Sequence, residues 1–205
     1  AQSAVHMPID VQDIGCDFYA VSGHKMLAPT GGGFLYGRYD WLEKMPPFQG
    51  GGEMIEKVDY AGTTYDDPPY KFEAGTPAIA PVLGIGAAIE YLEKVGLDTV
   101  RAWDEVLVRY ATDRLNTVPG LRMIGTAADK SGVCSFVIEG MHAFDIGTIL
   151  DRAGVAIRVG HHCAQPVMRH FGVDATARAS FALYNNKHDI DQFIEGLTLA
   201  REMLA

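Results

Sequence analysis

The stretch SGHKMLAPTGGG, residues 22–33, decides the fold because it places a lysine between two apolar segments. CDFYAV precedes it at residues 16–21, and FLYG follows at residues 34–37. These segments predict two buried strands joined by a tight turn. A lysine at the end of a buried strand is poorly solvated, which favours its neutral, nucleophilic amine. We therefore take Lys25 as a candidate for Schiff-base chemistry; the alternative is a surface lysine in a turn.

The neighbours of Lys25 suit a phosphorylated ligand. Ser22 and His24 lie on either side of Gly23, so both can donate to one phosphate while the lysine reaches the ring that carries it. The glycines that follow lack the GxxxxGK[ST] order of a nucleotide P-loop. The turn thus predicts a phosphate site of another kind.

A second chemical motif is RVGHHCAQP, residues 158–166. Adjacent histidines rarely bind one metal ion, and the sequence holds no second ligand pair at zinc spacing, so no metal site is predicted. A thiol beside imidazoles and before a short helix is placed to ionise, which makes Cys163 the candidate nucleophile. Cys16 and Cys134 lie in apolar runs and are expected to be inert core residues.

Two arginines are candidate anion ligands. Arg178 lies in a strand-like run of small residues, where its planar guanidinium matches a carboxylate. A salt bridge to one of the 26 acidic residues explains Arg178 equally well. Arg158 presents the same two alternatives.

Composition limits the function classes. The 205 residues are 48% hydrophobic and 21% charged, as in ordinary globular proteins, and the net charge of −9 argues against a basic nucleic-acid surface. The chain has no apolar run of about 20 residues and its start lacks signal-peptide features, so we expect a cytoplasmic protein without a membrane segment. Three scattered cysteines do not form a disulfide framework.

Hydrophobic spacing predicts the organisation of the chain. Residues 82–92 and 100–118 have helical periodicity, whereas residues 45–81 hold six of the ten prolines and predict an irregular segment at an active site or interface. After residue 120 short strands alternate with helices, which indicates a second α/β layer. Strands are expected within residues 121–125, 133–140, 155–160 and 177–184, and helices at residues 143–153, after Pro166 and at residues 190–204.

Five motifs in order extend the argument to a family: SGHKMLAPTGGG, FQGGGEMI, FEAGTPA, RVGHHCAQP and ARASFALYN. Together they resemble the C-terminal half of group II cysteine desulfurases of the sulfur-mobilising type, which are class V aminotransferase relatives. The resemblance implies the α/β fold of fold type I transferases dependent on pyridoxal 5'-phosphate (PLP). Residues 1–95 would form the C-terminal part of the large, mixed-sheet PLP-binding domain. Residues 96–205 would form the small C-terminal domain with the catalytic cysteine.

The resemblance also implies roles for the cofactor-binding residues. Lys25 would hold PLP covalently and then shuttle the α-proton of the substrate. Gln2 would hydrogen-bond the phenolic oxygen of the cofactor, and Ser22 and His24 would bind its phosphate. Thr76 would reach the phosphate of a neighbouring subunit, so the complete site would require a homodimer.

The substrate-binding residues follow in the same way. Arg178 would bind the carboxylate of L-cysteine, with Arg158 as a second candidate. The Cys163 thiolate would attack the substrate sulfur, leaving L-alanine and a persulfide on the enzyme. The sulfur would pass to an acceptor protein for iron–sulfur cluster assembly.

The resemblance is incomplete at the start of the sequence. In this family an acidic residue shortly before the Gln2 position pairs with the pyridine nitrogen, and a histidine further upstream stacks on the ring; His6 does not match that position. Because the electron sink depends on the protonated pyridine, we expect the 205 residues alone to be inactive. The alternatives are a selenocysteine lyase or cysteine sulfinate desulfinase of the same fold, and a non-catalytic sulfur-transfer scaffold.

Overall fold

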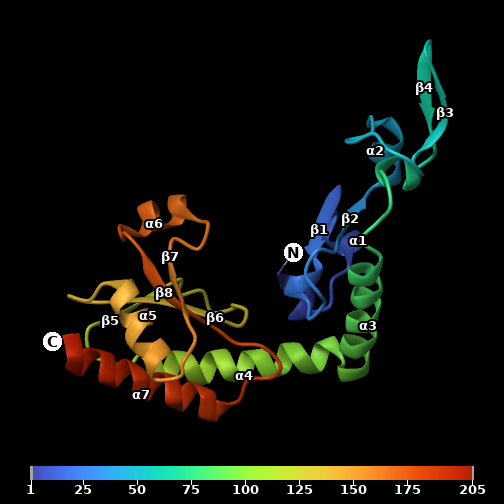
Figure 1. Ribbon diagram of the computed structural model, residues 1–205. Coiled ribbons are helices and arrows are strands. Elements are labelled where there is room, and N and C mark those ends of the chain that lie inside the picture. The colour runs from blue at the N-terminus through green and yellow to red at the C-terminus, as the bar shows by residue number, and fades with distance from the viewer. Residues whose placement is uncertain (1, 205) are drawn as a thin grey trace. The chain divides into compact units, whose positions relative to one another are not determined.

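The computed structural model describes residues 2–204 and divides into two compact units, Ala1–Leu97 and Asp98–Ala205 (Figure 1). The boundary expected from the sequence lies at residues 95 and 96, close to this division. None of the helices in the described part of the chain has the length and apolar character needed to cross a membrane.

Unit 1 combines two antiparallel hairpins with one long helix (Figure 1). Its strands are β1 (Phe18–Ser22), β2 (Gly33–Gly37), β3 (Ile55–Asp59) and β4 (Gly62–Tyr65). Its helices are α1 (Val11–Ile14), α2 (Tyr39–Lys44) and α3 (Ile79–Val95), with 3-10 turns η1 (Ser3–Val5), η2 (Gly23–Lys25) and η3 (Tyr70–Phe72). In the first hairpin Phe18 pairs with Gly37 and Ser22 with Gly33. The SGHKMLAPTGGG stretch is therefore the β1–β2 connection.

The two strands predicted at the start of unit 1 are present, but the prediction that they are buried is wrong. Val21 is the buried residue of β1, whereas Phe18, Phe34 and Leu35 are exposed. Two strands form no more than a narrow sheet, and the described chain leaves Phe18, Phe34 and Leu35 uncovered.

The segment at residues 45–81 is more ordered than the sequence predicts. It holds the β3–β4 hairpin, in which Val58 pairs with Thr63 and Asp59 with Gly62. All strand residues from Glu56 to Tyr65 are exposed, so the segment has no apolar alternation from which strands could be predicted.

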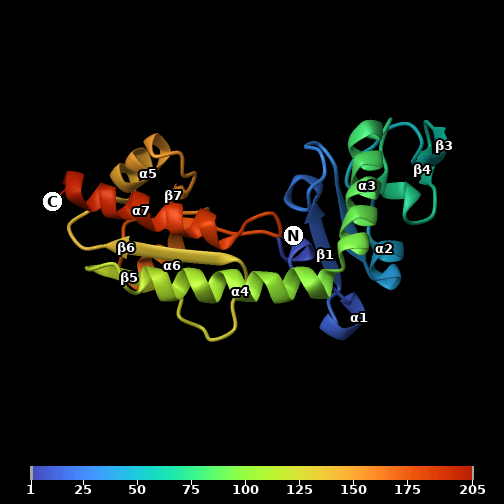
Figure 2. The same cartoon turned by 90° about the horizontal axis from the view of Figure 1, so that it is seen from below.

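Unit 2 is a four-stranded antiparallel sheet with helices packed along it (Figure 2). The strand order is β5-β6-β8-β7. The strands are β5 (Leu121–Ile124), β6 (Val133–Ile138), β7 (Arg158–Gly160) and β8 (Thr176–Ser180). The helices are α4 (Leu97–Leu115), α5 (Ala143–Arg152), α6 (Gln165–Phe171) and α7 (Lys187–Leu204). The helices and strands predicted after residue 96 are confirmed.

One hydrophobic core holds unit 2 together. Side chains of β6 alternate, so Cys134, Phe136 and Ile138 are buried while the intervening residues are less so. Phe136 meets Phe193 of α7 with ring centroids 5.9 Å apart. The prediction that Cys134 is a core residue is confirmed, and burial raises the pKa of its thiol. Cys16 is only half-buried, so the same prediction for that residue is wrong.

Candidate functional site

Cys163 lies on a tight turn between the edge strand β7 and helix α6. The amide of Ala164 donates to the carbonyl of His161 at 2.9 Å and closes the turn. Its two central residues, His162 and Cys163, have φ values of 54° and 60°. The thiol is exposed and borders a hollow of about 570 Å³, which Phe144 of α5 also lines. A reagent can therefore reach the sulfur of Cys163.

Two arginines flank this thiol because of the sheet register. Arg158 of β7 is the cross-strand partner of Arg178 of β8. The Arg158 Nη2 atom donates to Cys163 Sγ at 3.6 Å. Within the described chain neither arginine forms an ion pair with a carboxylate, so the salt-bridge alternative has no support. Two adjacent cations beside a nucleophile form a site that attracts an anion.

The environment of Arg178 fits an anionic ligand. Its side chain is partly buried, and its Nε atom is buried without a hydrogen-bond partner. Burial and the charge of Arg158 lower the pKa of Arg178, while Cys163 acts in the opposite direction. A carboxylate bound here would satisfy the guanidinium with its preferred bidentate geometry.

His162 connects the turn to the sheet, a role that the sequence does not indicate. Its Nε2 atom lies 2.8 Å from Thr176 Oγ1 and 3.1 Å from the Thr176 carbonyl oxygen. Thr176 is fully buried at the start of β8. From the sequence alone, metal binding is one role considered for the two histidines, and no metal site is predicted. Among residues 2–204 no three His, Cys, Asp or Glu side chains are grouped as metal ligands.

The predicted phosphate-binding residues of unit 1 lie together on the turn that follows β1. Ser22 ends the strand, and His24 and Lys25 belong to η2. The Gly23 amide donates to the Gly32 carbonyl oxygen at 2.9 Å, and a Cβ atom at Gly23 would lie 2.9 Å from the same oxygen. A side chain at position 23 would therefore push the turn away from the strand that follows it.

Lys25 is exposed, so the predicted burial of its amine is wrong for the described chain. Ser22, His24 and Lys25 form no side-chain hydrogen bond or ion pair with any other described residue. A hydroxyl, an imidazole and an amine without protein partners on one turn suit a ligand that carries both a phosphate and an aldehyde.

The other two predicted cofactor residues lie on separate segments of unit 1. Gln2 is exposed immediately before η1, and Thr76 is exposed between η3 and α3. No hydrogen bond between described side chains joins either of them to the Ser22–Lys25 turn. The described chain therefore assembles one part of the predicted cofactor site.

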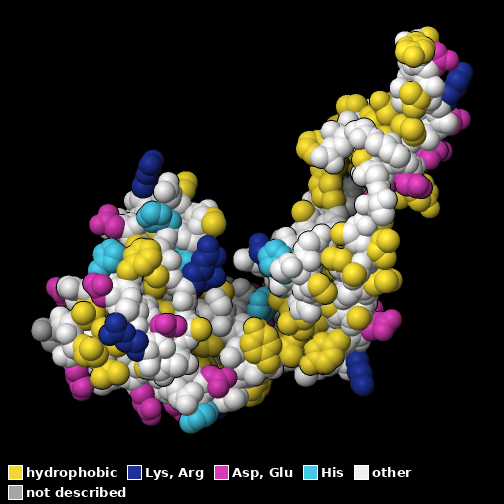
Figure 3. Space-filling model, viewed as in Figure 1, with side chains coloured by type: hydrophobic (Ala, Val, Ile, Leu, Met, Phe, Trp, Pro, Cys, Tyr) yellow, Lys and Arg dark blue, Asp and Glu magenta, His cyan; other side chains and the backbone are white. Residues whose placement is uncertain are grey.

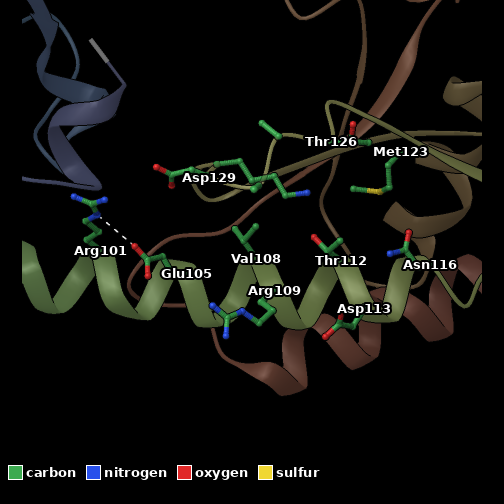
Figure 4. Close-up of a pocket in the computed structure, with 13 residues that line it drawn as sticks. Arg101, Glu105, Val108, Arg109, Thr112, Asp113, Asn116, Met123, Thr126 and Asp129 are labelled. Carbon is green, nitrogen blue, oxygen red and sulfur yellow. Dashed lines mark hydrogen bonds and ion pairs between the residues drawn. The ribbon is translucent and has the colours of Figure 1, made fainter.

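A further hollow of about 710 Å³ lies between α4 and the segment that leads to β6 (Figure 4). Basic and acidic side chains alternate along it, and Arg101 pairs with Glu105 at 3.3 Å. None of the residues predicted to carry chemistry lines this hollow. The sequence gives no sign of it because its walls come from an ordinary helix face and a loop.

Comparison with known proteins identifies relatives along the whole chain. The model of the family described as Aminotransferase class-V matches residues 1–193. A probable cysteine desulfurase of Xylella fastidiosa (strain Temecula1) is 48% identical over 204 residues, which cover 100% of this chain and 49% of the relative. A cysteine desulfurase of Dickeya dadantii is 47% identical and is covered to 50%. The chain thus spans about half the length of the curated relatives that it matches.

Solved structures agree with this assignment. The cysteine desulfurase CsdA of Escherichia coli, crystallised as an S-sulfonic acid, superposes with a TM-score of 0.95 at 43% identity. That match covers 100% of this chain and 51% of CsdA. The cystine C-S lyase C-DES, in complex with cysteine persulfide, gives a TM-score of 0.81 at 24% identity and supports the fold alone. The α/β transferase fold predicted from the sequence is confirmed.

Proposed function

Because this chain belongs to the class V aminotransferase family, we propose that the protein it forms is a PLP-dependent cysteine desulfurase. The substrate is L-cysteine, and the products are L-alanine and a persulfide on Cys163. The cysteine desulfurases among the relatives, at 45–52% identity to this chain, support the assignment.

One observation carries the proposal: an exposed thiol lies beside two arginines that have no carboxylate partner within the described chain. Arg178 binds the substrate carboxylate, and its partly buried guanidinium fixes the orientation of the amino acid. Arg158 contacts Cys163 directly, so it holds the nucleophile close to the bound substrate. Two arginines without a carboxylate partner in the described chain, next to an exposed thiol, have no evident role in a purely structural protein.

The turn after β1 holds the cofactor. Ser22 and His24 would donate to its phosphate, and the exposed amine of Lys25 would hold its aldehyde group and serve as the base for the α-proton of the substrate. Gln2 donates to its phenolic oxygen. PLP, when bound, supplies the electron sink for the bonds that break in the amino acid.

The sulfur-transfer step balances without an outside oxidant. The Cys163 thiolate forms a bond to the sulfur of L-cysteine, and the carbon–sulfur bond of the substrate breaks. The carbon fragment keeps the electron pair of that bond, takes up a proton and leaves as L-alanine. Cys163 retains the transferred sulfur as a persulfide.

The experiment compares the complete protein with its Cys163→Ala and Cys16→Ser variants. With L-cysteine and PLP, the wild type and Cys16→Ser are expected to form alanine and to gain one sulfur atom on the peptide that contains Cys163. Cys163→Ala is expected to lose both signals. Alanine formation by Cys163→Ala at the wild-type rate would contradict the proposal.

The same variants separate the alternatives. A selenocysteine lyase or cysteine sulfinate desulfinase would keep its activity on selenocysteine or cysteine sulfinate after Cys163→Ala. A scaffold would bind no cofactor, so the complete protein would lack PLP absorbance. For the desulfurase, Lys25→Ala is expected to abolish the absorbance of PLP bound covalently to the protein.

The proposal extends to the assembly and the cellular role. The protein acts in the cytoplasm as a homodimer in which Thr76 of each subunit reaches the phosphate in the other. It passes persulfide sulfur to an acceptor protein for iron–sulfur cluster assembly. Large apolar side chains are exposed on unit 1, among them Leu35, Val58, Tyr60 and Leu83. Hydrophobic side chains are spread over the visible face of this unit (Figure 3), which supports burial in a larger assembly. A preparation that is fully active and that light scattering shows to be monomeric would refute the homodimer.

A further inference from the structure

The turn that carries Cys163 has a backbone conformation that its residues do not favour. Positive φ at both central positions is typical of type I′ turns, in which Gly, Asn and Asp predominate. Here the central residues are His162 and Cys163. Adjacent non-glycine residues with positive φ occur at no other place in residues 2–204. Such a conformation persists only where the surrounding structure holds it.

The His162 side chain provides that restraint. Its Nε2 atom is within 3.1 Å of the Thr176 carbonyl oxygen, which can only accept a hydrogen bond, so Nε2 carries the proton. The same nitrogen is 2.8 Å from Thr176 Oγ1. Thr176 is itself fixed, since it is fully buried and pairs with Gly160 of β7. The turn is thus attached to the β7–β8 ladder through one imidazole ring.

The surroundings of the ring favour its neutral form. Nδ1 of His162 is buried without a hydrogen-bond partner, so a second proton there would have no acceptor. Burial contributes most to lowering the pKa of His162, followed by Arg178 of β8, with Arg158 of β7 and His161 adding to the effect. The Thr176 hydrogen bond opposes them, and no carboxylate contributes.

We propose that His162 is a positioning residue, whose ring, hydrogen-bonded to Thr176, holds the turn so that Cys163 Sγ faces Arg158. The contact between Arg158 and Cys163 depends on this restraint, because Cys163 is the next residue along the turn. The consequence for catalysis rests on the proposed desulfurase function, whereas the restraint itself does not.

Two substitutions at position 162 in the complete protein separate the two parts of the restraint. His162→Ala removes the ring and keeps the unfavourable positive φ, whereas His162→Gly removes the ring and tolerates that φ. For His162→Ala we expect hydrogen exchange in residues 161–165 to accelerate about tenfold or more, with a smaller increase for His162→Gly. His161→Gln is the matched control for hydrogen exchange, because the His161 ring is exposed and, among the described side chains, is within hydrogen-bond reach of Gln165 alone, at 3.5 Å. It is expected to leave exchange in residues 161–165 at the wild-type rate.

Kinetics supply a second, independent measurement. With L-cysteine, His162→Ala is expected to lower kcat by about tenfold or more with little change in KM, because Arg178 still binds the carboxylate. Thr176→Val, which keeps the carbonyl acceptor and removes the hydroxyl, should show a smaller loss. Near-wild-type exchange and kcat in both His162 variants would overturn the inference. If the complete protein has no desulfurase activity but exchange rises in His162→Ala, the inference stands and the proposed function fails.

Discussion

Gly147 of α5 is expected to control the position of β7, and thereby of Arg158. A Cβ atom at Gly147 would lie 2.8 Å from Val159 Cγ1, about 1 Å closer than carbon atoms normally approach. Overpacking of this kind costs about 1–3 kcal/mol, and the better helix propensity of alanine returns about 1 kcal/mol. The net cost of Gly147→Ala is therefore about 0–2 kcal/mol. Because β7 is a three-residue edge strand, we expect β7 to move rather than α5.

Hydrogen exchange of the complete protein measures this effect locally. A loss of about 1 kcal/mol corresponds to roughly fivefold faster exchange in the peptide that covers β7. Arg158, which contacts Cys163, would move with Val159, so the rate at which iodoacetamide alkylates Cys163 should also differ from that of the wild type. Gly86→Ala in α3 is the control, because a Cβ atom there meets nothing within 4 Å in the described chain.

The double variant Gly147→Ala/Val159→Ala provides the decisive comparison. Truncating Val159 removes the two methyl groups that the new Cβ would meet, so the two substitutions should be less damaging together than their separate effects predict, by about 1 kcal/mol. Strictly additive effects, or wild-type exchange in Gly147→Ala, would refute the reasoning.

Three further predictions test the core, the anion site and a helix terminus. Phe136→Ala should destabilise unit 2 by about 3–5 kcal/mol, measured by thermal unfolding, because its ring is completely buried against Phe193. Arg178→Lys should raise KM for L-cysteine about tenfold or more, since an ammonium group lacks the bidentate fork; an unchanged KM would exclude Arg178 as the carboxylate ligand. The pKa of Asp189 is lowered, chiefly by a hydrogen bond from the backbone amide of Asn186 and then by one from the Asn185 side chain. The ionised carboxylate therefore stabilises the start of α7 fully at pH values above its ordinary pKa of 3.8, and this stabilisation is lost as the pH falls and the carboxylate takes up a proton. Lower amide protection factors, which compare each observed exchange rate with the intrinsic rate at the same pH, are expected at the start of α7 on acidification and not in Asp189→Asn.

Local periodicity explains why unit 2 could be predicted so fully from the sequence. The alternation of Cys134, Phe136 and Ile138 and the helical spacing of Leu107, Ala111 and Leu115 reflect burial against one shared core. The β3–β4 hairpin lacks such a core, and its exposed residues carry no pattern. For a related reason the sequence predicts more burial of β1 and Lys25 than the structure shows. Apolar composition indicates which residues favour an interior, but it does not show that the described chain provides residues to cover them.

In the candidate site too, some features follow from neighbouring residues in the sequence, whereas others depend on strand pairing between residues far apart in the chain. RVGHHCAQP marks Cys163 as a nucleophile because the imidazoles and the short helix beside it lie in the same stretch of sequence. The relation of Arg158 to Arg178 comes instead from strand register, which pairs residues 20 positions apart. His162 is recognisable only once Thr176 is known to be buried within hydrogen-bond distance of it, since nothing in the neighbouring sequence indicates that contact. The sequence therefore identifies the reactive atom, whereas the sheet determines which charges surround it and what holds it in place.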